Sequence, residues 1–198
     1  MTDDLDDRLA AVLGVAEVTG LTRLSGGASR DTWRFEADGR RLILQRQREG
    51  SVRDISVESA AIRAAAIAGV PSATVVTASS DTTQLGAPYM IVTHVDGETT
   101  ARRILRDDEY QHARRALPAQ LADALVKIHS IDPATVPGIT DTDQVEQYRD
   151  VLDTLDEPHP TFELTLRWLE AHRPPISVDA VVHGDFRLGN VMVDRGGL

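Results

Sequence analysis

The sequence contains no cysteine, which excludes disulfide bonds and thiolate metal sites. Its six histidines are scattered and show no zinc-binding spacing such as His-Glu-x-x-His. No apolar run approaches the length needed to span a bilayer, and the acidic start Met-Thr-Asp-Asp is the reverse of a signal peptide. These absences predict a cytoplasmic protein that does not bind membranes.

Positive charge is also in short supply. The chain has 21 Lys and Arg residues against 31 Asp and Glu, a net charge of −10, which argues against a nucleic-acid surface. Its 198 residues are 41% hydrophobic and 26% charged, as in soluble globular proteins, and are enough for one domain or two small lobes.

The most informative stretch lies near the end of the chain, where an apolar pair, Val181-Val182, leads into His-Gly-Asp-Phe-Arg-Leu-Gly-Asn and then Val-Met-Val. This pattern predicts a strand, a polar loop and a second strand. Asp185 and Asn190 have the spacing of a kinase catalytic loop, with glycine in place of the usual arginine. An ordinary turn is the alternative, because Asp, Gly and Asn are turn residues. The flanking apolar residues and Asn190 favour the catalytic loop.

The run His-Gly-Asp-Phe-Arg-Leu-Gly-Asn resembles the motif of the aminoglycoside phosphotransferase and choline kinase family. Within that family, the run is similar to the branch related to the kinase-like domains of acyl-CoA dehydrogenase family proteins. The resemblance covers nearly the whole chain, from about Val18 onward. The resemblance implies an α+β, protein kinase-like two-lobe fold. Residues 1–97 would form an N-terminal nucleotide-binding lobe with an antiparallel sheet and the hinge, and residues 98–198 a partial helical C-terminal lobe.

The resemblance also implies a reaction, the transfer of the γ-phosphate of ATP to a hydroxyl group of a small molecule with the help of Mg²⁺. Asp185 would orient or deprotonate the hydroxyl, and Asn190 would bind the metal. Arg187 would place positive charge near the transferring phosphoryl group.

Ser25, Gly26 and Gly27 lie between two predicted strands, at 18–24 and 32–37. Glycines there let the backbone approach a phosphate closely, so the segment resembles the family's nucleotide-covering loop. A simple hairpin turn explains the two glycines equally well.

A third strand is predicted over 41–46, where a kinase carries the cation that binds the α and β phosphates. Arg46 is our choice for that cation because of its charge, although Gln45 is the alternative position. Glu58 lies on the same face of a predicted helix, 55–68, as Ile55 and Ile62. A carboxylate on an inward face needs a cation, so we expect Glu58 to pair with Arg46; a hydrated carboxylate at the rim is the alternative.

Two further strands are predicted, at 75–78 and at 89–95, and the second resembles the family's hinge. There, backbone groups of Thr93 and Val95 would bind the adenine.

Helices are predicted over 119–131, 145–155 and 162–171. Family relatives carry a second metal-binding Asp shortly after a Gly-Gly turn like Gly196-Gly197, and this sequence ends before such a residue. We therefore expect a truncated chain with little or no phosphotransferase activity. The alternative function is that of a non-catalytic fragment, or a module that binds a nucleotide or a partner protein.

Overall fold

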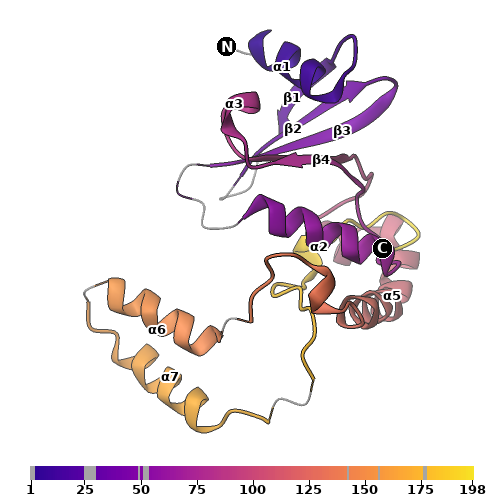
Figure 1. The fold of residues 1–198 in the computed structure, drawn as a ribbon. Helices are drawn as coiled ribbons and strands as arrows, with labels where there is room; N and C mark the ends of the chain where they lie inside the picture. Colours follow the sequence, from indigo (N-terminus) through magenta and orange to yellow (C-terminus); the bar gives the residue numbers. More distant parts are fainter. Residues whose placement is uncertain are drawn as a thin grey trace. The chain divides into compact units, whose positions relative to one another are not determined.

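The computed structural model describes residues 3–24, 30–48, 50, 54–141, 143–155, 157–175 and 178–198. The chain divides into two compact units, Met1–Pro137 with Ala180–Leu198, and Gly138–Asp179. The lobe boundary expected near Gly97 falls inside the first unit and stays a prediction. The chain path is shown in Figure 1.

The first unit contains one antiparallel sheet of five strands in the order β1-β2-β3-β5-β4. The strands are β1 (Thr19–Leu24), β2 (Arg30–Ala37), β3 (Arg40–Gln47), β4 (Val75–Ser79) and β5 (Tyr89–Thr93). A tight turn joins β2 to β3 at Asp38 and Gly39, both of which have positive φ angles, of 49° and 70°. Asp-Gly suits such a turn because these residues tolerate the left-handed region. All five predicted strands are confirmed, with ends shifted by one or two residues.

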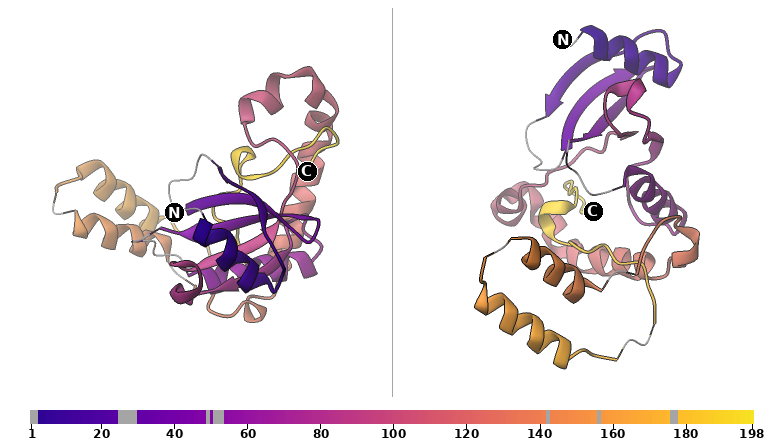
Figure 2. Two further views of the ribbon diagram at one scale, coloured as in Figure 1. Left: turned by 90° about the horizontal axis from the view of Figure 1, so that it is seen from above. Right: turned by 60° about the vertical axis from the view of Figure 1, so that its left-hand side comes forward.

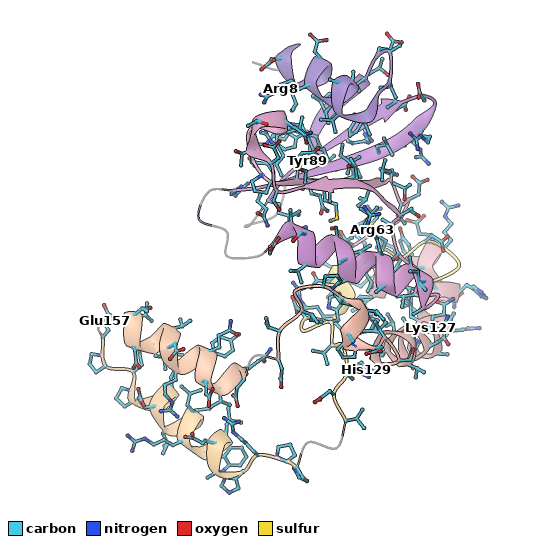
Figure 3. The ribbon with its side chains drawn as sticks, viewed as in Figure 1. Arg8, Arg63, Tyr89, Lys127, His129 and Glu157 are labelled. Carbon is cyan, nitrogen blue, oxygen red and sulfur yellow. The ribbon has the colours of Figure 1, made fainter. Side chains whose placement is uncertain are left out.

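One face of the sheet is covered by α1 (Asp3–Leu13) and α3 (Thr82–Leu85). Trp33, Phe35, Leu42 and Leu44 are buried on this face in the same cluster as Leu9 of α1. Arg8 joins the two helices, because its guanidinium donates to the carbonyls of Thr83 and Gln84 at 2.8 and 2.7 Å. Figure 3 labels Arg8 on α1.

The other face packs against α2 (Ile55–Ile67). Asp54 caps this helix, accepting a hydrogen bond from the Ser56 amide at 2.8 Å, and Ile55 is buried with Val75, Met90 and Val92. Ile43 of β3 joins that cluster, so residues 43 and 45 face α2 while 42, 44 and 46 face α1 and α3. Figure 2 gives two further views of this sheet and its helices.

The rest of the first unit is largely helical, with α4 (Ala101–Arg106), α5 (Gln111–His129) and short 3₁₀ turns at Asp108–Tyr110, Pro133–Thr135 and Leu188–Asn190. The helix predicted at 119–131 therefore begins eight residues earlier and includes Pro118. Among the residues that the structure describes, no helix combines the length and apolar character needed to cross a membrane.

The second unit is a pair of helices, α6 (Gln144–Thr154) and α7 (Pro160–Ala171), close to the predicted 145–155 and 162–171. Arg149 pairs with Glu170 at 3.0 Å, and Arg173 pairs with Asp143. The hydrogen bond from Arg173 holds the pKa of Asp143 below its usual value. These polar links join the two helices on the side away from the loop that connects them.

Candidate active site

The loop predicted to be catalytic brings its three key side chains together. The Asn190 side-chain amide donates to the Asp185 carboxylate at 2.7 Å and to the Asp185 carbonyl at 2.9 Å. The Arg187 Nε donates to both oxygens of the same carboxylate, at 3.1 and 3.3 Å. These bonds orient the Asp185 carboxylate. Its side chain remains 60% exposed, so a substrate can still reach it.

The glycine that replaces the usual arginine of the kinase motif has a conformational reason. Gly184 has a φ of 77°, a left-handed conformation that costs other residues about 1–2 kcal/mol. The turn there lets the Asp185 amide donate to His183 Nδ1 at 3.3 Å, and the His183 ring meets Phe186 edge to face at 5.5 Å. The backbone at Gly184 therefore helps to set the direction of Asp185.

The two strands predicted to flank the loop are not formed, and that prediction is wrong. Residues 180–182 are described without regular secondary structure, and the segment after the loop contributes one antiparallel bridge, between Glu98 and Val193. The apolar residues pack against helices instead: Val191 and Val193 are buried with Ile104 and Leu117 of α4 and α5. The loop therefore rests on the helical part of the first unit.

Asp194, which follows this segment, forms a turn. Its carboxylate accepts hydrogen bonds from the amides of Gly196 and Gly197, at 2.6 and 3.0 Å, and its own amide donates to the Gly197 carbonyl at 2.8 Å. The Asp194 carboxylate thus stabilises the turn that follows it, by accepting hydrogen bonds from nearby backbone amides.

The ion pair expected between Arg46 and Glu58 is contradicted by the structure. Arg46 donates to the carbonyl of Leu85 at 2.8 Å and stacks over Trp33 at 4.5 Å, on the face covered by α1 and α3. Burial on that face lowers the pKa of the Arg46 guanidinium. Because successive side chains of a strand point to opposite faces, Arg46 cannot also reach the helix on the other side.

Glu58 pairs with Arg30 instead, the first residue of β2. A second nitrogen of Arg30 donates to the Gln45 side-chain oxygen at 2.8 Å, so Gln45 lies on the face that we had expected Arg46 to occupy. Sequence reasoning missed Arg30. The available signal was the alternation along the strand. It puts Arg30 on the same face as Arg34 and Glu36, and the apolar Trp33 and Phe35 on the other.

At the end of β5, the Thr93 amide donates to the Thr74 carbonyl at 2.9 Å, and the Thr93 hydroxyl accepts from the Thr74 amide at 2.9 Å. The Val95 amide makes no backbone hydrogen bond with any described residue, and its side chain is 40% exposed. Adenine binding at Thr93 and Val95 stays a prediction. Ser25, Gly26 and Gly27 lie outside the described residues.

The loop suits a magnesium-bound nucleotide. Mg²⁺ prefers hard oxygen ligands and is often held by one or two protein groups together with substrate phosphates. The Asn190 amide nitrogen points at Asp185, which turns its oxygen away from that carboxylate. Asn190 thus keeps an amide oxygen for a metal ion, next to the exposed carboxylate of Asp185.

Comparison with known proteins gives consistent results. A model of the phosphotransferase enzyme family matches residues 20–198. Acyl-CoA dehydrogenase family member 10 of Mus musculus is 29% identical over 209 aligned residues, which cover 96% of this chain and 19% of that protein. The chain therefore spans about a fifth of the length of this curated relative.

Two solved structures share the fold. The structure of aminoglycoside phosphotransferase APH(4)-Ia is 20% identical with a TM-score of 0.70, covering 100% of this chain and 69% of the other. A thermostable mutant of that protein, in ternary complex with AMP-PNP and hygromycin B, is 20% identical with a TM-score of 0.68. The match covers 98% of this chain and 68% of the other. The α+β, protein kinase-like fold class is thus confirmed. Since the family model covers most of its length, the chain belongs to the phosphotransferase enzyme family.

Proposed function

We propose that this protein uses ATP and Mg²⁺ to transfer a phosphoryl group to a hydroxyl group of a small molecule. The observation that carries the proposal is the convergence of Asp185, Arg187 and Asn190 in one loop. Phosphoryl transfer depends mainly on positioning and on electrostatic stabilisation, and these three side chains supply both.

Each side chain has its own task. Asp185 accepts the proton of the attacking hydroxyl, and Arg187 faces the charge on the transferring group. Asn190 would hold Mg²⁺, which neutralises charge on the nucleotide phosphates. The Val95 amide and the Thr93 carbonyl are the backbone groups that would bind the adenine.

Similar proteins support the choice of ligands. The APH(4)-Ia mutant was crystallised with AMP-PNP, an ATP analogue, and with a small molecule, hygromycin B. The fold that it shares with this chain suits a nucleotide together with a small-molecule acceptor.

The first experiment measures the melting temperature of the protein with and without Mg²⁺ and AMP-PNP. Ligand at about 100 times its Kd stabilises a folded protein by about 2.7 kcal/mol, so a clear rise is expected. Asn190→Ala should lose most of the rise, and Gln147→Ala on the exposed side of α6 should retain it. The proposal fails if the nucleotide does not raise the melting temperature of the wild-type protein.

The little or no activity expected from the sequence stays a prediction. The second experiment tests it by measuring turnover with labelled ATP and a panel of small alcohols, amino alcohols and sugars. Asp185→Asn should lower transfer about 100-fold or more while nucleotide binding persists, because a general base contributes that much. Asp150→Asn, an exposed aspartate of α6, is the matched control. Nucleotide binding by the wild-type protein without transfer to any acceptor would favour the alternative, a nucleotide-binding module without turnover.

A further inference from the structure

On the α2-facing side of β3, position 45 carries glutamine and no cation of the kind that a kinase places on this strand. Gln45, which lies on that side and shares the Arg30 guanidinium with Glu58, is neutral, and the neighbouring Arg46 points to the opposite face. Glu58 is held toward the sheet because Ile55, one turn earlier on α2, is buried against β4 and β5. A carboxylate in this half-buried place needs a cation from another strand.

Arg30 meets this need from β2. In the sheet register Thr32 is paired with Gln45 and Arg30 with Gln47, so Arg30 is the diagonal neighbour of Gln45 on one face. Its guanidinium bonds both Glu58 and the Gln45 side chain, and its side chain is only 15% exposed. The two partners fix the guanidinium from two sides.

The guanidinium also keeps donors for a further ligand. An arginine side chain has five N–H donors, and the bonds to Gln45 and Glu58 account for two, which leaves three. Arg30 makes no other side-chain hydrogen bond within the described ranges. A planar fork of this kind matches phosphate oxygens well.

We propose that Arg30, oriented by Glu58 and Gln45, is the phosphate-binding cation of the nucleotide site, in place of a cation on β3. This inference rests on the proposed function, since it assigns a residue to the same nucleotide site. Gln45 and Glu58 act as positioning residues, and Arg46 serves the stability of the opposite face.

The test measures the affinities of AMP-PNP with Mg²⁺ and of adenosine by titration calorimetry. Arg30→Ala should weaken AMP-PNP binding about tenfold or more and leave adenosine binding unchanged, because only the phosphates lose a partner. Arg40→Ala, which removes the same charge at the distant start of β3, should change neither affinity. Arg46→Ala should lower the melting temperature without weakening AMP-PNP binding.

A relocated charge separates loss of function from misfolding. Gln45 faces the same way as Arg30, so Gln45→Lys in the Arg30→Ala background puts an ammonium beside Glu58 from the third strand. This double variant should recover AMP-PNP affinity to within a few fold of the wild type. A double variant that binds no better than Arg30→Ala overturns the proposal.

The remaining outcomes also give clear answers. If wild-type protein binds AMP-PNP and Arg30→Ala binds it equally well, the Arg30 assignment is wrong while the proposed function stands. If Arg46→Ala weakens AMP-PNP binding and Arg30→Ala does not, Arg46 is the phosphate ligand. If the wild-type protein does not bind AMP-PNP, both proposals fall.

Discussion

The direction of one carboxylate depends on the backbone of the residue before it. Gly184 has a φ of 77°, and beyond its own two chain neighbours no atom would lie within 4 Å of a Cβ built there. A side chain at this position would therefore cost conformational energy without causing a clash. Asp185 follows directly and accepts a hydrogen bond from Asn190 at 2.7 Å, so we expect a change of backbone at Gly184 to disturb this pair.

Gly184→Ala should lower the free energy of unfolding by about 1 kcal/mol and reduce phosphate transfer to the acceptor, because the left-handed turn is strained by a Cβ. Gly14→Ala is the matched control: Gly14 has a φ of 67° and equally open surroundings, but it ends α1 far along the chain from the loop. Denaturant unfolding and transfer assays on both variants check this. Equal activity losses in the two variants would contradict a directing role for Gly184.

At the scale of elements, α2 matters because it holds Glu58 against the sheet. Asp54 begins the helix with its side chain, which accepts hydrogen bonds from the hydroxyl and the amide of Ser56. The hydroxyl bond is the main reason that the pKa of Asp54 lies below its usual value. A carboxyl whose pKa is depressed by folding contributes stability above its unfolded pKa and loses that contribution as the pH falls through the folded one.

Asp54→Asn should therefore change the pH dependence of stability more than the stability at neutral pH. Asparagine caps helices well and does not titrate, so the melting temperature of the wild type should fall relative to that of the variant between about pH 5 and pH 2. Melting curves across this range provide the test, with Asp150→Asn as the control that caps no helix. Parallel curves for wild type and Asp54→Asn would show that the cap carries no pH-dependent stability.

At the scale of the whole first unit, two distant parts of the chain meet at one bridge. The Glu98 amide donates to the Val193 carbonyl at 2.8 Å, and the Val193 amide donates to the Glu98 carbonyl at 3.0 Å. Gly97 permits this approach, since a Cβ there would lie 3.1 Å from the Val193 nitrogen and 3.2 Å from its oxygen. The bridge thus joins the segment after the predicted hinge to the segment after the loop of Asp185 and Asn190.

Gly97→Ala should weaken this bridge, because both backbone atoms of Val193 would have to move by a few tenths of an ångström. We expect faster hydrogen exchange of the Val193 amide, measured by NMR. The Asp194 amide, which bonds Gly197 within the next turn, is an internal control and should exchange at an unchanged rate. Unchanged protection at Val193 would mean that the bridge accommodates the methyl group.

The sequence by itself determined the five strands of the sheet, most helices and the grouping of Asp185, Arg187 and Asn190, because these depend on local spacing. Alternation along β3 also put Gln45 and Arg46 on opposite faces. This alternation does not say which face α2 covers, and charge alone favoured Arg46 as the phosphate-binding cation. Only the packing of Ile43 and Ile55 in one cluster decided that question, and only the pairing of β2 with β3 brought Arg30 beside Glu58. Contacts between residues far apart in the chain depend on strand register and helix docking, and no local pattern contains them.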